Sequence, residues 1–250
     1  MKQLNNTGFF LIILLLVAPF AYGDMKQVQF ESRDGLPITA DLYLSNPETA
    51  PFILLFHQAG WSRGEYRETA PLLNKMGYNC MAIDQRSGRE VNGVSNETAR
   101  IAFKQKKGMT YLDAYIDLSA ALHYVLKNYP KGKKILLGSS YSASLVLRLA
   151  AEHPDKIAAV LAFSPGEYFK KQKNATYIQS FASRIQCPVF ITSSKNENHY
   201  WQVIYNKIGG KKASFLPESP GNHGSRALWA QFKDSVAYWQ AVKGFLKTIK

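Results

Sequence analysis

Residues 135–145 constrain this chain more than any other stretch, because an apolar run leads through a turn of small residues into an amphipathic pattern. A strand, a sharp turn and a helix in this order are typical of a nucleophile elbow, which raises a serine hydroxyl above the end of a sheet. Ser140 is the candidate nucleophile. The usual pattern is Gly-x-Ser-x-Gly, and here Ser142 replaces the last glycine. A serine at such a junction is also common as an ordinary helix N-cap, so the motif needs support from the rest of the chain.

The order of residues downstream gives that support, because a serine hydrolase with this elbow needs an acid and then a histidine, each just after a later strand. The β-rich run 188–192 leads into a polar segment that contains Glu197, the candidate acid. A further short run, 213–217, is followed by a loop that contains His223, the candidate base. Glu167, which follows an earlier predicted strand, is the alternative acid.

Strand and helix patterns alternate along the rest of the chain, and residues 26–45 predict a hairpin around Asp34-Gly35. Apolar runs predict strands, and apolar residues at helical spacing predict helices. The strands are expected at 52–56, 78–84 and 158–163, and the helices at 65–76, 111–129, 145–152 and 227–250. This alternation predicts a mostly parallel, twisted sheet with helices on both faces. The polar connection 85–110 is the one stretch long enough to form an active-site rim.

The first residues predict a signal peptide rather than part of the fold. Lys2 and a polar stretch precede residues 9–20, which are almost wholly apolar, and small residues stand before an expected cleavage point after Gly23. An uncleaved membrane anchor is the alternative, yet about 12 apolar residues fall short of the roughly 20 that span a bilayer. We therefore expect residues 1–23 to be removed from an exported protein, periplasmic or secreted, whose mature chain is a single domain over 24–250.

The chain is strongly basic, with a formal charge of +13, of which the predicted signal peptide contributes a single lysine. Nucleic acid is not expected as a partner, because the chain is exported and its lysines are not interleaved with stacking aromatic residues. A solvated basic face is the simplest interpretation of this charge. Weak attraction to an anionic membrane surface or to an anionic substrate is the alternative.

Four segments together resemble the α/β-hydrolase superfamily, nearest to its dienelactone-hydrolase-like and small serine esterase branches. They are the turn 57–60, the segment 82–88, the elbow at 138–142 and the pair His223-Gly224. The resemblance covers nearly all of the chain after the predicted signal peptide. It implies a sheet of about eight strands with catalytic groups at the carboxyl ends of the strands. A sizeable cap domain is not expected, because residues 164–187 are too few to form one.

The resemblance also implies which backbone amides form the oxyanion hole. One amide belongs to Tyr141, directly after the nucleophile. The other belongs to the 57–60 turn, where Ala59 is the first choice and Gln58 the second. Such donors stabilise the negative charge that grows on the carbonyl oxygen, and the loss of one costs roughly 3 kcal/mol.

Other polar residues near these motifs are expected to have structural roles. His57 is typical of a buried histidine at such a turn, and Asp84 and Arg86 are expected to brace a turn, with contact to substrate as the alternative. No metal site is expected, because His199 lies close to Glu197 in the sequence but lacks a third ligand. The predicted mechanism needs no organic cofactor.

The chain has two cysteines, which in an exported protein could form a disulfide. Cys80 lies at one predicted strand and Cys187 just before another. In the strand order that the resemblance implies, these strands are several positions apart at roughly 4.8 Å each, which exceeds the limit of about 7 Å between bridged Cα atoms. We therefore predict two free, buried thiols.

Together, the residues and the resemblance predict an exported serine hydrolase, most simply a carboxylic-ester hydrolase that works through Ser140, His223 and Glu197 and an acyl-enzyme. An uncapped site favours a small-molecule or surface-presented ester as substrate. Three alternatives stay open, because fold does not fix function. They are a catalytically silent binding protein of the cell envelope, a peptidase or acyltransferase on the same fold, and an envelope protein that binds through its positive face.

Overall fold

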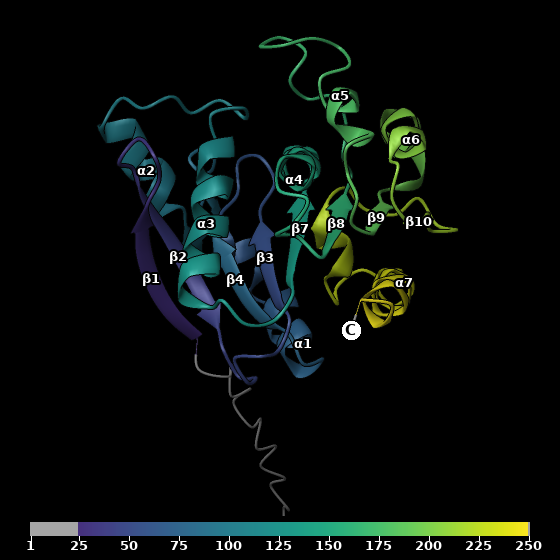
Figure 1. The fold of residues 1–250 in the computed structure, drawn as a ribbon, viewed down its shortest axis with the longest axis horizontal. Coiled ribbons are helices and arrows are strands. Elements are labelled where there is room, and N and C mark those ends of the chain that lie inside the picture. The colour runs from purple at the N-terminus through teal and green to yellow at the C-terminus, as the bar shows by residue number, and fades with distance from the viewer. Residues whose placement is uncertain (1–24, 250) are drawn as a thin grey trace, which may run out of the picture.

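The computed structural model describes residues 25–249, and an eight-stranded sheet forms its centre (Figure 1). The predicted signal peptide, residues 1–23, lies outside the described residues. In sheet order the strands are β1 (Met25–Glu31), β2 (Pro37–Tyr43), β4 (Asn79–Ile83), β3 (Phe52–Phe56), β7 (Lys134–Ser139), β8 (Ala159–Phe163), β9 (Val189–Thr192) and β10 (Lys212–Phe215). β1 and β2 form an antiparallel hairpin, β2 runs antiparallel to β4, and the remaining pairs are parallel. The predicted mostly parallel sheet with an opening hairpin is confirmed.

Helices cover both faces of this sheet (Figure 1). One face carries α2 (Glu97–Lys104), α3 (Tyr115–Asn128), α4 (Tyr141–Glu152), α5 (Gln179–Ala182) and α6 (Asn198–Lys207), and the other carries α1 (Thr69–Lys75) and α7 (Ser235–Lys247). The predicted helix 65–76 is divided between a short 3-10 turn, η1 (Arg63–Tyr66), and α1.

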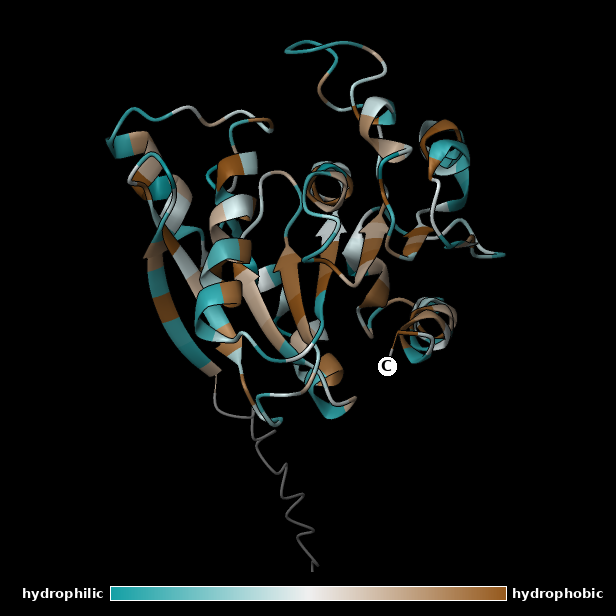
Figure 2. Cartoon of the chain, in the orientation of Figure 1, coloured by the Kyte–Doolittle hydropathy of each residue, from teal (hydrophilic) through white to brown (hydrophobic). Residues whose placement is uncertain are grey.

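The central strand β3 shows why the inner strands of the sheet are mostly apolar, whereas the edge strand β1 is not (Figure 2). Phe52, Leu54 and Phe56 belong to the core on the side of α3 and α4, whereas Ile53 and Leu55 belong to the core on the side of α1 and α7. A strand that is buried on both faces has no position that water reaches, so its sequence does not alternate.

The stretch 85–110, predicted as a polar connection, contains regular structure. A short hairpin of β5 (Glu90–Val91) and β6 (Val94–Ser95) precedes α2. The side chain of Asn96 caps α2 by accepting from a first-turn amide. The hydroxyl oxygen of Thr98 accepts from the backbone N–H of Thr39 on β2. The polar residues that are typical of a loop therefore attach a helix to the sheet.

The C-terminal helix is shorter than the predicted 227–250, because α7 begins at Ser235 and a 3-10 turn, η3 (Ser225–Leu228), precedes it. Trp229 follows η3, and its indole N–H donates to the backbone oxygen of Glu65 at 3.0 Å. This part of the apolar pattern therefore packs as a separate segment. Within α7, Val236 is 63 % exposed, although it is apolar.

The two cysteines are free and buried, as predicted. Cys80 lies in β4 and Cys187 just before β9, and β3, β7 and β8 separate these strands. Burial raises the pKa of the Cys187 thiol to about 11 and that of Cys80 further, so both are protonated at neutral pH.

Among residues 25–249, no helix combines the length and the apolar character that crossing a bilayer requires.

Candidate active site

Ser140 occupies the sharp turn between β7 and α4, with φ 60° and ψ −125°. A positive φ is unfavourable for a residue with a side chain, and strain of about 1–3 kcal/mol of this kind clusters at active sites. The turn leaves no space for a side chain at Gly138, where a Cβ would lie 2.5 Å from the backbone oxygen of Ser142. The backbone amide of Ser140 donates to the backbone oxygen of Phe163 on β8 at 2.7 Å. These contacts fix the Ser140 hydroxyl at the carboxyl end of β7.

Ser142, which stands where the elbow pattern has glycine, makes two hydrogen bonds. Its hydroxyl donates to the backbone oxygen of His57 at 2.6 Å and accepts from the side-chain amide of Gln85 at 2.7 Å. The start of α4 is thereby tied to the turn after β3 and to the turn after β4. Glycine could make neither bond, so serine at position 142 adds a connection between α4 and these two turns that the usual pattern lacks.

The structure brings Ser140, His223 and Glu197 into one chain of hydrogen bonds. The Nε2 atom of His223 lies 2.8 Å from the Ser140 Oγ, and its Nδ1 atom lies 2.6 Å from a Glu197 carboxylate oxygen. Glu197 ends the 3-10 turn η2 (Lys195–Glu197) after β9, and His223 lies in the loop after β10. With Nδ1 donating to the carboxylate, Nε2 is left to accept the serine proton.

Ser164, which the sequence analysis did not single out, joins the acid to the histidine loop. Its hydroxyl donates to Glu197 at 2.7 Å and accepts from the amide of Gly224 at 2.9 Å. Burial by itself would raise the pKa of Glu197, but the bonds from His223 and Ser164 outweigh it and hold that pKa below its usual value. Glu197 is therefore ionised at neutral pH. A Ser-Pro pair directly after a buried strand was the available sequence signal for Ser164.

Glu167, the alternative acid, does not contact His223. Its two carboxylate oxygens accept from the backbone amides of Ile178 and Gln179 at 2.8 and 2.9 Å. Glu167 therefore caps the first amides of α5, a common role for a carboxylate at a helix start. The alternative acid is corrected to a capping residue.

The amides of Tyr141 and Ala59 lie on the two turns that Ser142 ties together. Within residues 25–249, neither N–H donates a hydrogen bond to another residue. The amide of Gln58, the second choice for the oxyanion hole, donates to a carboxylate oxygen of Glu65 at 2.8 Å and is not free for a substrate. Gln58 is therefore corrected to a structural donor, and Ala59 is the amide of this turn that could bind an oxyanion.

Two tyrosines that the sequence analysis did not assign lie beside the nucleophile turn. Tyr168 donates from its hydroxyl to the backbone oxygen of Ser164 at 2.8 Å and also contacts the Ser140 hydroxyl. Burial raises the pKa of Tyr168 to about 12, so its hydroxyl is neutral and can donate. The ring of Tyr111 stacks on the ring of Tyr141 with centroids 4.6 Å apart. Tyr111 is 39 % exposed and so forms part of the surface around the site.

Asp84 and Arg86, the charged residues after β4, are buried in ion pairs. Asp84 pairs with Arg63 at 2.7 Å, and Arg86 pairs with Asp117 at 2.7 Å. Burial raises the pKa of both carboxyl groups to about 6, although the arginines oppose the rise. These residues brace the fold, as predicted, and are too deeply buried to touch a substrate.

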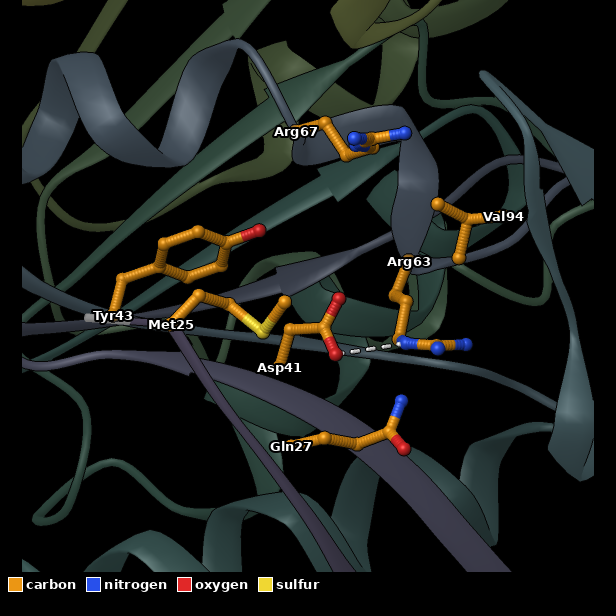
Figure 3. A pocket seen from close by; sticks show the side chains of 7 residues that line it. All are labelled: Met25, Gln27, Asp41, Tyr43, Arg63, Arg67 and Val94. Carbon is orange, nitrogen blue, oxygen red and sulfur yellow. Dashed lines mark hydrogen bonds and ion pairs between the residues drawn. The ribbon is translucent and has the colours of Figure 1, made fainter. Parts of the chain in front are cut away.

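Arg63 also bonds to Asp41 at 2.9 Å, in the wall of a pocket of about 410 Å³ beside the β1–β2 hairpin (Figure 3). Met25, Gln27, Asp41, Tyr43, Arg63, Arg67 and Val94 line this pocket. None of the predicted catalytic residues is among them. The pocket is thus separate from the site around Ser140.

His57 is fully buried at the end of β3 and makes structural bonds. Its Nδ1 atom lies 2.8 Å from the backbone oxygen of Gln58, and its Nε2 atom accepts from the amide of Gln85 at 2.9 Å. Burial lowers the pKa of His57 to about 4 and keeps the ring neutral.

In the described part of the chain, no group of three or more His, Cys, Asp or Glu side chains is placed to hold a metal ion.

The fold and the nucleophile turn define a serine hydrolase of the α/β-hydrolase fold. The chain belongs to the family described as serine aminopeptidase S33, whose pattern it matches over residues 47–207. The family resemblance drawn from the motifs is confirmed. A search of curated proteins gave no match.

Solved structures share this fold at low sequence identity. A dienelactone hydrolase from Anabaena variabilis ATCC 29413 superimposes with a TM-score of 0.70 at 14% identity, covering 91% of this chain and 99% of that one. The esterase Pf2001 of Pyrococcus furiosus gives 0.70 at 18% identity, covering 90% and 93%. An acetyl xylan esterase from Paenibacillus sp. R4 gives 0.67 at 16% identity, covering 93% and 86%.

Proposed function

We propose that the protein is a carboxylic-ester hydrolase that works through Ser140, His223 and Glu197. The observation that carries this proposal is the unbroken line of hydrogen bonds from the Ser140 hydroxyl through both nitrogens of His223 to the Glu197 carboxylate. Each group has the partner that its role requires, since the base is oriented by an acid and lies within reach of the nucleophile.

In the proposed reaction, His223 takes the proton of Ser140 as the serine oxygen attacks the ester carbonyl. The amides of Tyr141 and Ala59 stabilise the oxyanion of the tetrahedral intermediate. His223 then gives its proton to the leaving alcohol, and an acyl-enzyme forms on Ser140. Water, deprotonated by His223, attacks the acyl carbon and releases the acid, and the proton returns to Ser140. Glu197 stabilises the imidazolium in both halves of the cycle.

Several fold neighbours support an ester as the substrate, because they are named a dienelactone hydrolase, an esterase and an acetyl xylan esterase. The only helix between β8 and β9 in the described chain is the four-residue α5, so the segment adds little cover over the site. An uncapped site suits short acyl groups and acyl groups presented on a larger surface. Cleavage of a peptide is the competing function, since the family description is that of an aminopeptidase.

Export is part of the same proposal and depends on the sequence of residues 1–23. A protein released after Gly23 would begin at Asp24 and keep a formal charge of +12. That charge favours weak attraction to anionic membrane surfaces. Export would place the enzyme among ester substrates of the envelope. N-terminal sequencing of the protein recovered from cells tests the cleavage, and a retained Met1 would contradict it.

A fluorophosphonate probe tests the nucleophile directly, because it reacts covalently with an activated serine. The folded wild-type protein should give one adduct, which peptide mass spectrometry should locate on Ser140. Ser140→Ala should abolish labelling and hydrolysis of p-nitrophenyl acetate. Ser119→Ala, a serine on α3 outside the site, should leave both unchanged. An unlabelled, folded wild-type protein would favour a catalytically silent binding protein.

A further inference from the structure

A fully buried carboxylate that the proposed reaction does not use lies behind the site. Glu65 belongs to η1 and has no exposed surface. One of its carboxylate oxygens accepts from the Gln58 amide at 2.8 Å, and the other accepts from the Ser225 hydroxyl at 2.5 Å. The Ser139 hydroxyl also lies close enough to this carboxylate to stabilise its negative charge. All of these partners can donate, so the bonding pattern suits the ionised group.

The three partners belong to the three segments that build the site. Gln58 directly precedes Ala59 in the oxyanion turn, Ser139 directly precedes the nucleophile, and Ser225 lies two residues after His223. Ser139 and Ser225 are joined to each other as well, because the Ser225 amide donates to the Ser139 hydroxyl at 2.8 Å.

The histidine loop also lies directly on the same group of side chains. Gly224 has φ +71°, and a Cβ there would lie 2.5 Å from the Ser139 Oγ and 2.7 Å from the Gln58 Oε1. A larger residue would have to displace one of these side chains or the loop, and the positive φ would strain it. The position of His223 thus depends on contacts with the oxyanion turn and with the end of β7, and Glu65 binds both.

We propose that Glu65 is a positioning residue that holds the Ala59 amide and His223 in register with Ser140. The peptide that carries the Gln58 N–H is anchored to the carboxylate, and this anchor limits rotation of the adjoining peptide, which carries the Ala59 N–H. The Ser225 and Ser139 bonds fix the histidine loop against the nucleophile strand. This role rests on the proposed function, because it concerns the geometry of that reaction.

Electrostatics support the same role. Burial raises the pKa of Glu65 to about 6, and the bonds from Ser225, Ser139 and Gln58 limit that rise. The group is therefore ionised at neutral pH. The negative charge of Glu65 also interacts with His223. A buried anion near the base favours the imidazolium that forms during the reaction.

Substitution of Glu65 should change transition-state stabilisation more than substrate binding. Glu65→Leu removes both acceptors, and we expect kcat for p-nitrophenyl acetate to fall about 100-fold, with KM changed less than about threefold. Glu65→Gln keeps one acceptor for the Gln58 amide and should recover about tenfold of that loss. Ser225→Ala, which removes a single donor, tests the histidine side of the network if Glu65→Leu does not fold. It should lower kcat about tenfold.

Inhibition by a boronic acid separates positioning from simple loss of stability, because its adduct with serine places an oxygen in the oxyanion hole. The inhibition constant, measured on sites counted by fluorophosphonate titration, should rise by about the same factor as kcat falls. Asp117→Asn is the matched control, since Asp117 is also a buried carboxylate with a pKa raised to about 6. It should lower the melting temperature and leave the inhibition constant within about twofold of the wild-type value.

The outcomes separate this inference from the proposed function. If the wild-type protein hydrolyses esters and is labelled on Ser140, but Glu65→Gln and Ser225→Ala keep kcat and the inhibition constant within about twofold, the positioning role is wrong and the proposed function stands. If wild-type protein is folded but inactive and unlabelled, both fail. A parallel rise of the inhibition constant and loss of kcat establishes the role.

Discussion

The Glu197–His223 and Asp117–Arg86 contacts are 2.6 and 2.7 Å long, yet their surroundings differ. The side chains of His223 and Glu197 are 33% and 22% exposed, whereas those of Arg86 and Asp117 are 2% and 0% exposed. His223 has a second ring nitrogen that reaches Ser140, but the guanidinium of Arg86 has no acceptor atom. A short contact between acid and base therefore does not identify a catalytic pair. The features that distinguish the two pairs are access to solvent and a further partner that can exchange a proton with the base.

The largest effect is expected at the half-buried Glu197–His223 pair. Glu197→Gln removes the charge that orients His223 and stabilises the imidazolium, and kcat should fall by about 10⁴-fold. The free energy of unfolding should change less than at the buried Asp117–Arg86 pair, because water partly screens a half-buried pair. Steady-state kinetics and urea unfolding measure the two quantities.

Glu167→Gln is the control for this prediction, since Glu167 caps α5 and does not contact His223. Its kcat should stay within about twofold of the wild-type value. Activity lost in Glu167→Gln and retained in Glu197→Gln would reverse the assignment of the acid.

The opposite response is expected at the buried pair. Asp117→Asn removes the fully buried partner of Arg86 and leaves only the half-exposed Asp34, and the free energy of unfolding should fall by about 3 kcal/mol. The value of kcat per titrated active site should stay within about twofold, because Asp117 bonds to no residue of the proposed site. Urea unfolding and active-site titration check this pair of results. Unchanged stability would show that the ion pair contributes nothing.

A third buried group, His57, should give a smaller, pH-dependent effect. Its folded-state pKa of about 4 lies below the ordinary value of 6.5, so the unfolded chain takes up the proton first as the pH falls. The free energy of unfolding therefore declines from pH 6.5 towards pH 4. Between pH 7 and pH 5, the wild type should lose about 2 kcal/mol relative to His57→Gln. Urea unfolding at both pH values measures the difference in free energy of unfolding between the wild type and His57→Gln. A difference that is the same at pH 7 and pH 5 would contradict the buried neutral ring.

The smallest change concerns the thiols. Because Cys80 and Cys187 are buried and free, the native protein should not react with a thiol reagent, whereas the protein unfolded in guanidinium should react at both. Intact mass under non-reducing conditions should equal that of the reduced chain. A mass about two units lower, from the two hydrogens lost in bridging, would show a disulfide.

The sequence by itself determined the strand, turn and helix around Ser140, the continuous apolar strands and the chain order of serine, acid and histidine. These features are local, because hydrophobic periodicity and turn chemistry act over a few neighbouring residues. The same local patterns misplaced the helix in 85–110 and the start of α7. In both cases the polar and aromatic side chains make their contacts with residues distant in the chain.

Only the tertiary structure shows that Glu197 contacts His223 and Glu167 does not, and that the Gln58 amide is bonded to Glu65. These contacts depend on which groups meet across the carboxyl ends of the strands. The Ser140–His223 bond joins residues 83 positions apart, and the bond between Glu65 and Ser225 joins residues 160 positions apart. No local pattern encodes such distances, because the partners come together only when the sheet assembles.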